Sequence, residues 1–390
     1  MTKAFSSLLV FTTLLAAGQT PAGPDQSAAR RGPSAQIQSP SLRIEFDKNM
    51  RSRVVARFGA KDIPLGVFSA SETVKDTERS LYDFALSSQT HERVTDTYGA
   101  GEKLTLAGIS GVLKKDLSVI IYDEFPNLAV FDVSYTNTGK SQLKILEWTN
   151  NRYAIDAPGS SADVPFWSFQ SGSYERRPNW IVPLHAGFSQ QNYLGMNASD
   201  YGGGTPIVDV WRRDVGMGVG HVEPRPRLIS LPVSMLNARQ AQVSVEYRHE
   251  QSLQPGESLH TFRTFVAVHN GDYFQTLLTY RRFMLKQGFQ MARAPESAFG
   301  AIWCAWGYGR NFKPQQVYDT LPTVKRMGFT WVTLDDGWQN NYGDWKLDPK
   351  KFPHGDADIK AMVDRIHQEG FKAQLWWSPL SAVPDSKLLT

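Results

Sequence analysis

The sequence predicts two regions of different fold class, an antiparallel β-sandwich followed by an α/β region with a parallel sheet. Between residues 41 and 270, many short apolar stretches alternate with period two and are separated by turn residues, with no amphipathic helical stretch between them. From residue 299 onward, near-continuous apolar stretches alternate with amphipathic helical stretches instead. That second pattern is typical of βαβ units, in which both faces of each strand are covered.

The N-terminal residues have the composition of an export signal. Lys3 precedes the apolar stretch FSSLLVFTTLLAA and several small residues, which predicts a signal peptide over residues 1–18 and a secreted or periplasmic protein. The apolar stretch is too short for a membrane span, so no membrane association is expected. Residues 19–40 are rich in Gly, Pro, Ser and Gln and predict a disordered lead-in.

Strand signals are clearest in two parts of the sandwich region, residues 41–270. Residues 242–248 (QVSVEYR) and 127–135 (NLAVFDVSY) alternate between apolar and polar side chains, as half-buried strands do. The turn residues NTG at 137–139 then predict a hairpin that pairs the second stretch with QLKILEW at 142–148. The region therefore predicts a large antiparallel sandwich.

A helical linker is predicted over residues 271–298. Asp272 is suited to begin a helix there, and Gly288 is suited to end it. The apolar residues between them recur at helical spacing, and the predicted stripe comprises Phe274, Leu277, Leu278 and Leu285.

Residues 299–390 predict three βα units of a parallel sheet. The strands are FGAIWCAW, FTWVTL and FKAQLWW, and amphipathic helices follow Pro314 and begin near Asp358. Pro322 lies inside the first of these helices and is expected to kink or shorten it. Ligands in parallel α/β architectures bind at the carboxyl ends of the strands, so the residues there form the candidate site.

Each predicted strand end carries tryptophan, and two adjacent aspartates follow the second strand. One such tryptophan is most simply core packing, but three strand ends favour an aromatic cleft that stacks on sugar rings. Asp335 and Asp336, adjacent in a strand, point to opposite faces and are poorly placed to flank one scissile bond. They are better suited to accept hydrogen bonds from sugar hydroxyls, with an Asp-Gly turn as the structural alternative.

Composition excludes several other functions. The formal net charge is +4 with no basic block, so nucleic-acid binding is not expected. The eight histidines have no partner at metal-ligand spacing, and neither a metal nor another cofactor is expected. Cys304 is the only cysteine, which excludes an internal disulfide, and it is interpreted as a small buried hydrophobic residue.

The stretch from Trp303 to Pro379 contains WCAW, LDDGWQ, GDW, KFPHG and GFKAQLWWSP, and it resembles the α-galactosidases of glycoside hydrolase family 36 and their raffinose-synthase-like branch. The resemblance implies an N-terminal antiparallel β-supersandwich followed by the first three βα units of a (β/α)8 TIM barrel. It also implies that Asp335 and Asp336 hold the 4- and 6-hydroxyls of a terminal galactose. The residues assigned to substrate binding are Asp335, Asp336, Trp303, Trp338, Trp345 and Trp376.

The activity implied by the resemblance is that of a secreted, retaining glycoside hydrolase that cleaves terminal α-linked galactose from oligosaccharides. In the family the nucleophile and the acid/base are aspartates at the ends of strands four and six. Both are therefore expected after Thr390, which makes this a truncated chain that is inactive alone. The sequence has Ser378-Pro379-Leu380 where bacterial members usually have Glu-Pro-Glu. A galactosyl-transferring enzyme, a glycosidase for another α-linked sugar and a non-catalytic carbohydrate-binding remnant remain alternatives, and a homo-oligomer is left open.

Overall fold

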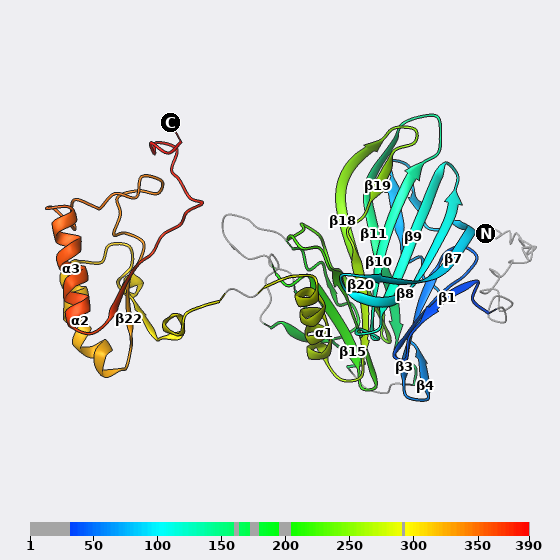
Figure 1. Cartoon of the computed structure of the whole chain (residues 1–390), viewed down its shortest axis with the longest axis horizontal. Helices are drawn as coiled ribbons and strands as arrows, with labels where there is room; N and C mark the ends of the chain where they lie inside the picture. The colour runs from blue at the N-terminus through cyan, green and yellow to red at the C-terminus, as the bar shows by residue number, and fades with distance from the viewer. Residues whose placement is uncertain (1–31, 160–163, 172–178, 195–203, 291–292, 390) are drawn as a thin grey trace, which may run out of the picture. The chain divides into compact units, whose positions relative to one another are not determined.

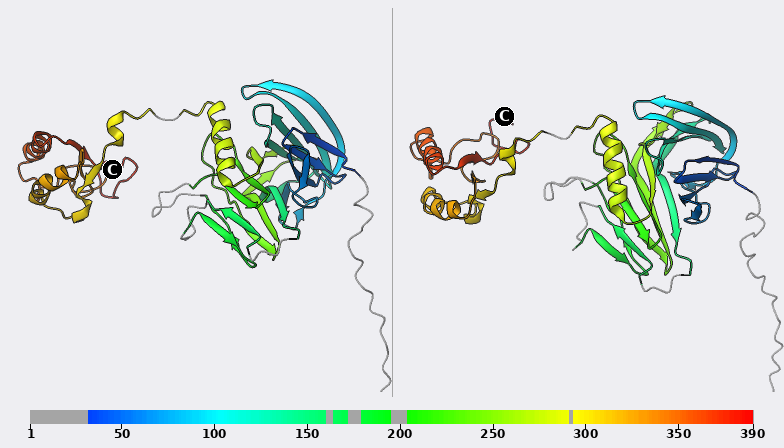
Figure 2. Two further views of the ribbon diagram at one scale, coloured as in Figure 1. Left: turned by 90° about the horizontal axis from the view of Figure 1, so that it is seen from below. Right: turned by 60° about the horizontal axis from the view of Figure 1, so that its bottom comes forward.

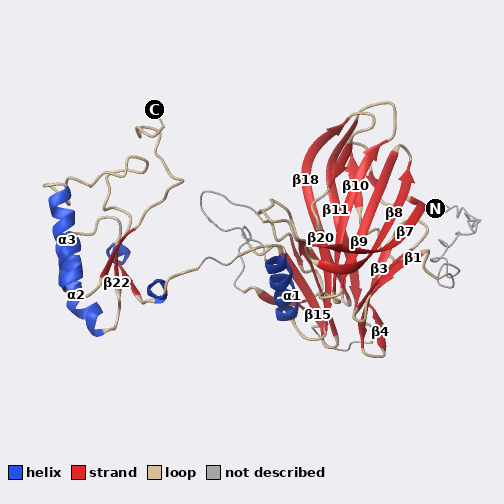
Figure 3. Ribbon diagram, viewed as in Figure 1, coloured by secondary structure: helices blue, strands red, loops and turns tan. Residues whose placement is uncertain are grey.

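The computed structural model describes residues 32–159, 164–171, 179–194, 204–290 and 293–389. The chain forms two compact units, Met1–Gln290 and Met291–Thr390 (Figure 1). The first is built almost entirely of strands, and the second combines strands with helices (Figure 3). The predicted signal peptide lies outside the described residues. Among the described helices, none is long and apolar enough to cross a membrane.

Three antiparallel sheets form the first unit. The four-stranded sheet has the order β1-β2-β3-β4 and comprises β1 Ala35–Gln38, β2 Leu42–Phe46, β3 Ser52–Phe58 and β4 Lys61–Pro64. The six-stranded sheet has the order β14-β17-β18-β11-β5-β6 and comprises β5 Thr73–Asp76, β6 Ser80–Leu81, β11 Leu143–Asp156, β14 Ser189–Gln190, β17 Val233–Asn237 and β18 Gln240–Leu253. The ten-stranded sheet has the order β13-β12-β15-β16-β20-β10-β9-β8-β7, with β19 also paired to β10. It comprises β7 Ala85–Asp96, β8 Gly99–Ser110, β9 Leu113–Tyr122, β10 Leu128–Asn137, β12 Phe166–Phe169, β13 Ile181–Leu184, β15 Ile207–Arg212, β16 Val215–His221, β19 Ser258–His260 and β20 Thr264–His269.

The first strand lies inside the segment predicted as a disordered lead-in. β1 pairs with β2, and its residues Ala35 and Ile37 are buried. The prediction is wrong for these residues because two apolar side chains in alternation give even a polar segment one face that can be buried.

The chain changes sheet after β10, where the sequence predicted a hairpin. β10 pairs with β9, β19 and β20, whereas β11 pairs with β5 and β18 in the six-stranded sheet. Both strands exist, but the predicted pairing between them is wrong. The side-chain oxygen of Asn137 accepts from the N–H of Gly139, and its Nδ2 donates to the carbonyl of Leu253. This side-chain turn directs the chain across to the other sheet.

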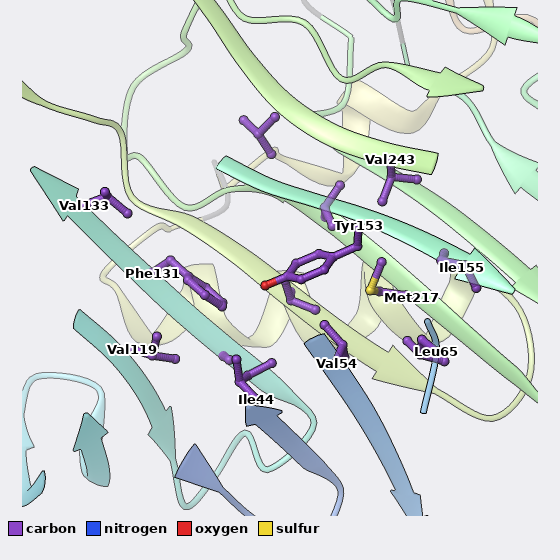
Figure 4. Close-up of a cluster of buried hydrophobic side chains, with 14 of the residues drawn as sticks. Ile44, Val54, Leu65, Val119, Phe131, Val133, Tyr153, Ile155, Met217 and Val243 are labelled. Carbon is purple, nitrogen blue, oxygen red and sulfur yellow. The ribbon is translucent and has the colours of Figure 1, made fainter. Parts of the chain in front are cut away.

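One apolar interior is shared by the three sheets. Figure 4 shows Phe131, Tyr153 and Met217 converging on it, beside Ile44 and Val54 from the four-stranded sheet. All five side chains belong to residues that are at most 2% exposed. Burial of the inward faces of all three sheets explains the regular alternation of apolar residues in this part of the sequence.

A lysine occupies one inward-facing position of β9. Lys115 is fully buried, its ammonium donates to the carbonyl of Glu72 at 3.1 Å, and it lies 4.4 Å from the ring centroid of Phe84. Burial lowers the pKa of Lys115 to about 8, although the nearby Glu72 carboxylate opposes this effect. Burial likewise raises the pKa of the Glu72 carboxyl, which Lys115 opposes. The pair therefore carries a desolvation cost inside the sandwich.

Helix α1, Tyr273–Lys286, begins after Asp272 as predicted, and the Asp272 side chain accepts from the N–H of Phe274. The helix packs on β15, β16 and β20 of the ten-stranded sheet, as both views in Figure 2 show, and belongs to the first unit rather than to a linker. The predicted stripe is wrong for three of its four residues, and the fourth, Leu277, packs on buried side chains. The buried residues are Thr276, Phe283 and Met284, whereas Phe274, Leu278 and Leu285 are exposed.

A buried polar contact sets the rotation of α1. Thr276 Oγ1 donates to Oδ2 of the buried Asp209 at 2.6 Å, and His269 Nε2 lies 3.1 Å from both oxygens of that carboxylate. Gly218 on β16 leaves room for the contact, since a Cβ there would lie 2.3 Å from Thr276. A pattern of apolar residues carries no information about such a contact, which is why it predicts the wrong face.

The second unit contains a parallel sheet of order β21-β22-β23, comprising β21 Ile302–Cys304, β22 Trp331–Leu334 and β23 Lys372–Leu375. Helix α2, Pro314–Arg326, follows β21, helix α3, Asp356–Gln368, follows β22, and short 3-10 helices span Glu296–Phe299 and Ala305–Tyr308. The predicted parallel βα region is confirmed, with two βα units and the strand of a third described. α2 continues through Pro322 without the expected shortening, and Pro322 lies on its solvent side.

Packing of both helices on one face of the sheet forms the core of the second unit. Val332 and Leu334 of β22 are buried against Leu321 of α2 and against Met362 and Ile366 of α3. The central strand is thereby fixed, and with it the residues that follow its carboxyl end.

Candidate functional site

The carboxyl ends of the three parallel strands lie at the same edge of the sheet, as the sequence predicts. Cys304 of β21 is in register with Thr333 of β22, and Thr333 with Gln374 of β23. The segments that follow β21, β22 and β23 therefore start side by side, and they contain the predicted site residues.

Asp336 is the most highly connected side chain at this edge. It is 8% exposed, and Arg310 Nη1 donates to both of its carboxylate oxygens at 2.8 Å. Gln339 Nε2 donates to Oδ1 at 2.7 Å, and the hydroxyl of Tyr342 donates to Oδ2. Four hydrogen bonds from the protein occupy the acceptor positions of this carboxylate, so its role here is to order the surrounding loops.

Tyr342 remains a donor in this arrangement. Burial and the hydrogen bond to the Asp336 carboxylate raise the pKa of the Tyr342 phenol, and Arg310 opposes the effect. The guanidinium carbon of Arg310 also lies 5.2 Å from the ring centroid of Tyr342. Sequence reasoning did not identify Arg310, Gln339 or Tyr342. The only signal was the position of Gln339 and Tyr342 within a few residues of the aspartates.

Asp335 has more free acceptor capacity than its neighbour. It is half-buried, its Oδ1 accepts from the N–H of Asp336 at 2.6 Å, and its Oδ2 accepts from the thiol of Cys304 at 2.8 Å. Burial, followed by the hydrogen bond to Asp335, raises the pKa of the Cys304 thiol and keeps it protonated as a donor. Cys304 is therefore a half-buried polar partner of the site, not the simple buried hydrophobic residue predicted.

Two of the predicted tryptophans lie in the core. Trp338 is 7% exposed and donates from Nε1 to the carbonyl of Trp376 at 2.8 Å, which joins the loop after β22 to the end of β23. Trp303 is half-buried, is in register with the buried Val332, and packs against the same core. Trp338 also stacks on Trp345, with ring centroids 6.3 Å apart, so it connects the core to the aromatic residues at the strand ends.

The other predicted tryptophans do meet at the strand ends. The ring centroids of Trp345 and Trp376 are 6.0 Å apart, and that of Tyr342 lies 5.6 Å from Trp345. Trp377 joins this group at 6.4 Å from Trp345 and is 60% exposed. Trp306, at the end of β21, is 51% exposed. These two exposed rings were outside the predicted set, although both belong to the strand-end motifs WCAW and WWSP.

Comparison with known proteins agrees with this architecture. The melibiase family model matches residues 277–390. The A type blood α-D-galactosamine galactosaminidase of Flavonifractor plautii is 26% identical over 323 residues, which cover 80% of this chain and 29% of that protein. α-Galactosidase 1 of Pediococcus pentosaceus is 31% identical over 85 residues, 20% of this chain and 11% of that protein.

A solved family 36 α-galactosidase, AgaA of Geobacillus stearothermophilus, has a similar fold, with a TM-score of 0.52 and 16% identity over 91% of this chain and 57% of that one. A variant of that enzyme was solved in complex with stachyose. The chain therefore shares the fold of a solved family 36 α-galactosidase, and its sequence is similar to those of glycoside hydrolases. The sequence likeness over residues 277–390 is to the melibiase family, in agreement with the resemblance to glycoside hydrolase family 36. The chain spans about a third or less of the length of these sequence relatives.

Proposed function

We propose that the chain supplies the sandwich and the sugar-binding edge of a secreted, retaining α-galactosidase-like hydrolase that acts on oligosaccharides with terminal α-linked galactose. The observation that supports this proposal is that the two aspartates differ in how far the protein already occupies their carboxylate oxygens with hydrogen bonds. Asp336 is saturated by protein donors, whereas Asp335 retains acceptor capacity at the same edge of the sheet as the exposed rings of Trp306 and Trp377. A carboxylate beside flat apolar faces matches the alternating hydroxyl and C–H surfaces of a pyranose.

The chemistry of this edge is binding and orientation of the sugar. A retaining hydrolase requires two carboxyl groups about 5–5.5 Å apart that flank the glycosidic bond, one acting as nucleophile and the other as acid/base. Asp336 is unsuited to the nucleophile role, because its oxygens already accept from Arg310, Gln339 and Tyr342. Asp335 accepts a sugar hydroxyl in this proposal, and Trp377 covers an apolar face of the ring.

Binding and hydrolysis test the proposal separately. Titration calorimetry with galactose and methyl α-galactoside measures binding, and Asp335→Asn is expected to weaken it at least tenfold. In the whole hydrolase of which this chain is proposed to form part, hydrolysis of an aryl α-galactoside, with the anomeric form of the product followed by NMR, tests for a retaining mechanism. Absence of binding by the wild-type chain at millimolar galactose would argue against the proposed subsite.

A second candidate substrate is an α-linked galactosamine. It is supported by the similarity to the Flavonifractor galactosaminidase, which extends over 80% of this chain. Galactose, galactosamine and N-acetylgalactosamine differ only at C2, so competition among their aryl α-glycosides separates the candidates. Product analysis with added sugar acceptors tests galactosyl transfer by the whole protein, and sugar binding without any turnover by that whole protein would favour the carbohydrate-binding alternative.

Export is tested independently of the sugar. Residues 1–18, fused to a reporter that is active only outside the cytoplasm, are expected to direct its secretion. Retention of the reporter inside the cell would contradict the proposed location.

A further inference from the structure

Lys351 lies between β22 and α3, outside the set of predicted site residues. Its ammonium donates to the carbonyl oxygen of Arg310 at 2.5 Å and to that of Gly337 at 2.7 Å. It also lies 4.3 Å from the ring centroid of Phe312. One cation thus joins the loop after β21 to the loop after β22; we call this contact the lysine bridge.

The two residues whose carbonyl oxygens accept from Lys351 are both in direct contact with Asp336, one through its side chain and one through the peptide bond. Arg310 donates to both oxygens of the Asp336 carboxylate, and Gly337 follows Asp336 in the chain. The two loop backbones approach closely here, since a Cβ on Gly337 would lie 2.0 Å from the carbonyl oxygen of Arg310. Two carbonyl oxygens held beside each other repel unless a donor lies between them, and the ammonium of Lys351 supplies that donor.

The surroundings of Lys351 favour this single geometry. The residue is half-buried, and the face of Phe312 covers one side of its ammonium. The adjacent Lys350 is exposed, and its described hydrogen bond is made by the backbone N–H to Asp348 rather than by the side chain. Lys350 is therefore a matched control, because it carries the same charge as Lys351 and lies next to it in the segment before α3.

We propose that Lys351 is a positioning residue for the sugar subsite, acting on Asp336 through Arg310 and Gly337. The role in sugar binding rests on the proposed function, whereas the ordering of the two loops does not. In this arrangement the lysine bridge fixes the loop backbones, the loops fix the Asp336 network, and that network sets the position of Asp335.

Amide hydrogen exchange tests the ordering of the loops without any sugar. Lys351→Met is expected to accelerate exchange at least tenfold in residues 305–312 and 335–345, while leaving α3 near its wild-type rate. Lys350→Met should leave all these segments unchanged. Equal protection in Lys351→Met and the wild type would overturn the proposal, as would an equal effect of the control substitution.

Sugar affinity tests the consequence for the site. Lys351→Ala is expected to weaken galactose binding at least tenfold, and ethylammonium, but not tetramethylammonium, should restore part of it because only the former has N–H donors. Met362→Ala, which alters the core on α3, supplies a variant of reduced stability without a change at the bridge. Equal losses of affinity in both variants would assign the effect to stability and overturn the positioning role. If the wild type binds no sugar, the proposed function fails, and the exchange experiment still decides whether Lys351 orders the loops.

Discussion

Arg310 Nη1 donates to both carboxylate oxygens of Asp336 at 2.8 Å, and so joins the loop after β21 to the loop after β22. The two residues are 26 positions apart in the sequence. Asp336 is nearly buried, whereas the Arg310 side chain is 40% exposed. Through this contact the second aspartate of the DDGW motif, Asp336, orders the two loops, and this role distinguishes it from Asp335.

Replacement of Arg310 tests this relationship. Arg310→Met removes two of the four hydrogen bonds to the Asp336 carboxylate, and we expect the free energy of unfolding of the second unit to fall by about 1–3 kcal/mol. Urea denaturation followed by tryptophan fluorescence measures the loss. Arg326→Met, an exposed arginine at the end of α2, should stay within about 0.5 kcal/mol of the wild type. Equal effects of the two substitutions would contradict the assignment.

Gly337 is predicted to tolerate no side chain. Its φ of 105° lies in the region that favours glycine, and a Cβ would lie 2.0 Å from the carbonyl oxygen of Arg310. Gly337→Ala is expected to cost more than the roughly 1–3 kcal/mol of backbone strain alone. Gly370→Ala is the control for strain without collision, since Gly370 has a φ of 90° and open space around its Cβ position. Thermal unfolding compares the two, and a smaller loss at Gly337 would refute the close approach.

Lys115 predicts an unusual dependence of stability on pH. Its pKa is about 8 in the folded protein and 10.5 when unperturbed, so the unfolded chain binds more protons between these values. The free energy of unfolding should therefore rise with pH from about 8 to 10.5, by on the order of 3 kcal/mol from this residue. Urea denaturation at several pH values measures the slope. The slope should disappear in Lys115→Met and persist in Lys140→Met, an exposed lysine.

Thr276 is predicted to anchor α1 to the sandwich. Thr276→Val keeps the shape of the side chain but removes the donor to the buried Asp209, which we expect to cost about 1–3 kcal/mol. Hydrogen exchange in α1 should rise more than in β10. Thr90→Val, an exposed position on β7, is the control and should have little effect. Unchanged exchange in α1 would show that packing alone holds the helix.

Patterns within a single element were sufficient to predict much of the fold. All but the first residue of the alternating stretch 127–135 fall in β10, and the apolar stretch FTWVTL contains β22. The motif DDGW at the end of β22 also identified the edge at which the candidate site lies. These predictions depend on neighbours along the chain, whose spacing in a strand or helix is fixed by backbone geometry.

Contacts between distant residues decided the rest. Asn137 directs β11 into the other sheet, and Asp209 determines which face of α1 is buried. Trp338 lies in the core while Trp377 is exposed, although the two residues follow adjacent strands. The sequence by itself determined where the motif and many of the strands and helices occur, although not β1. The tertiary structure alone determined which aspartate is saturated, because Arg310 comes from another loop and meets Asp336 only when the strands pair.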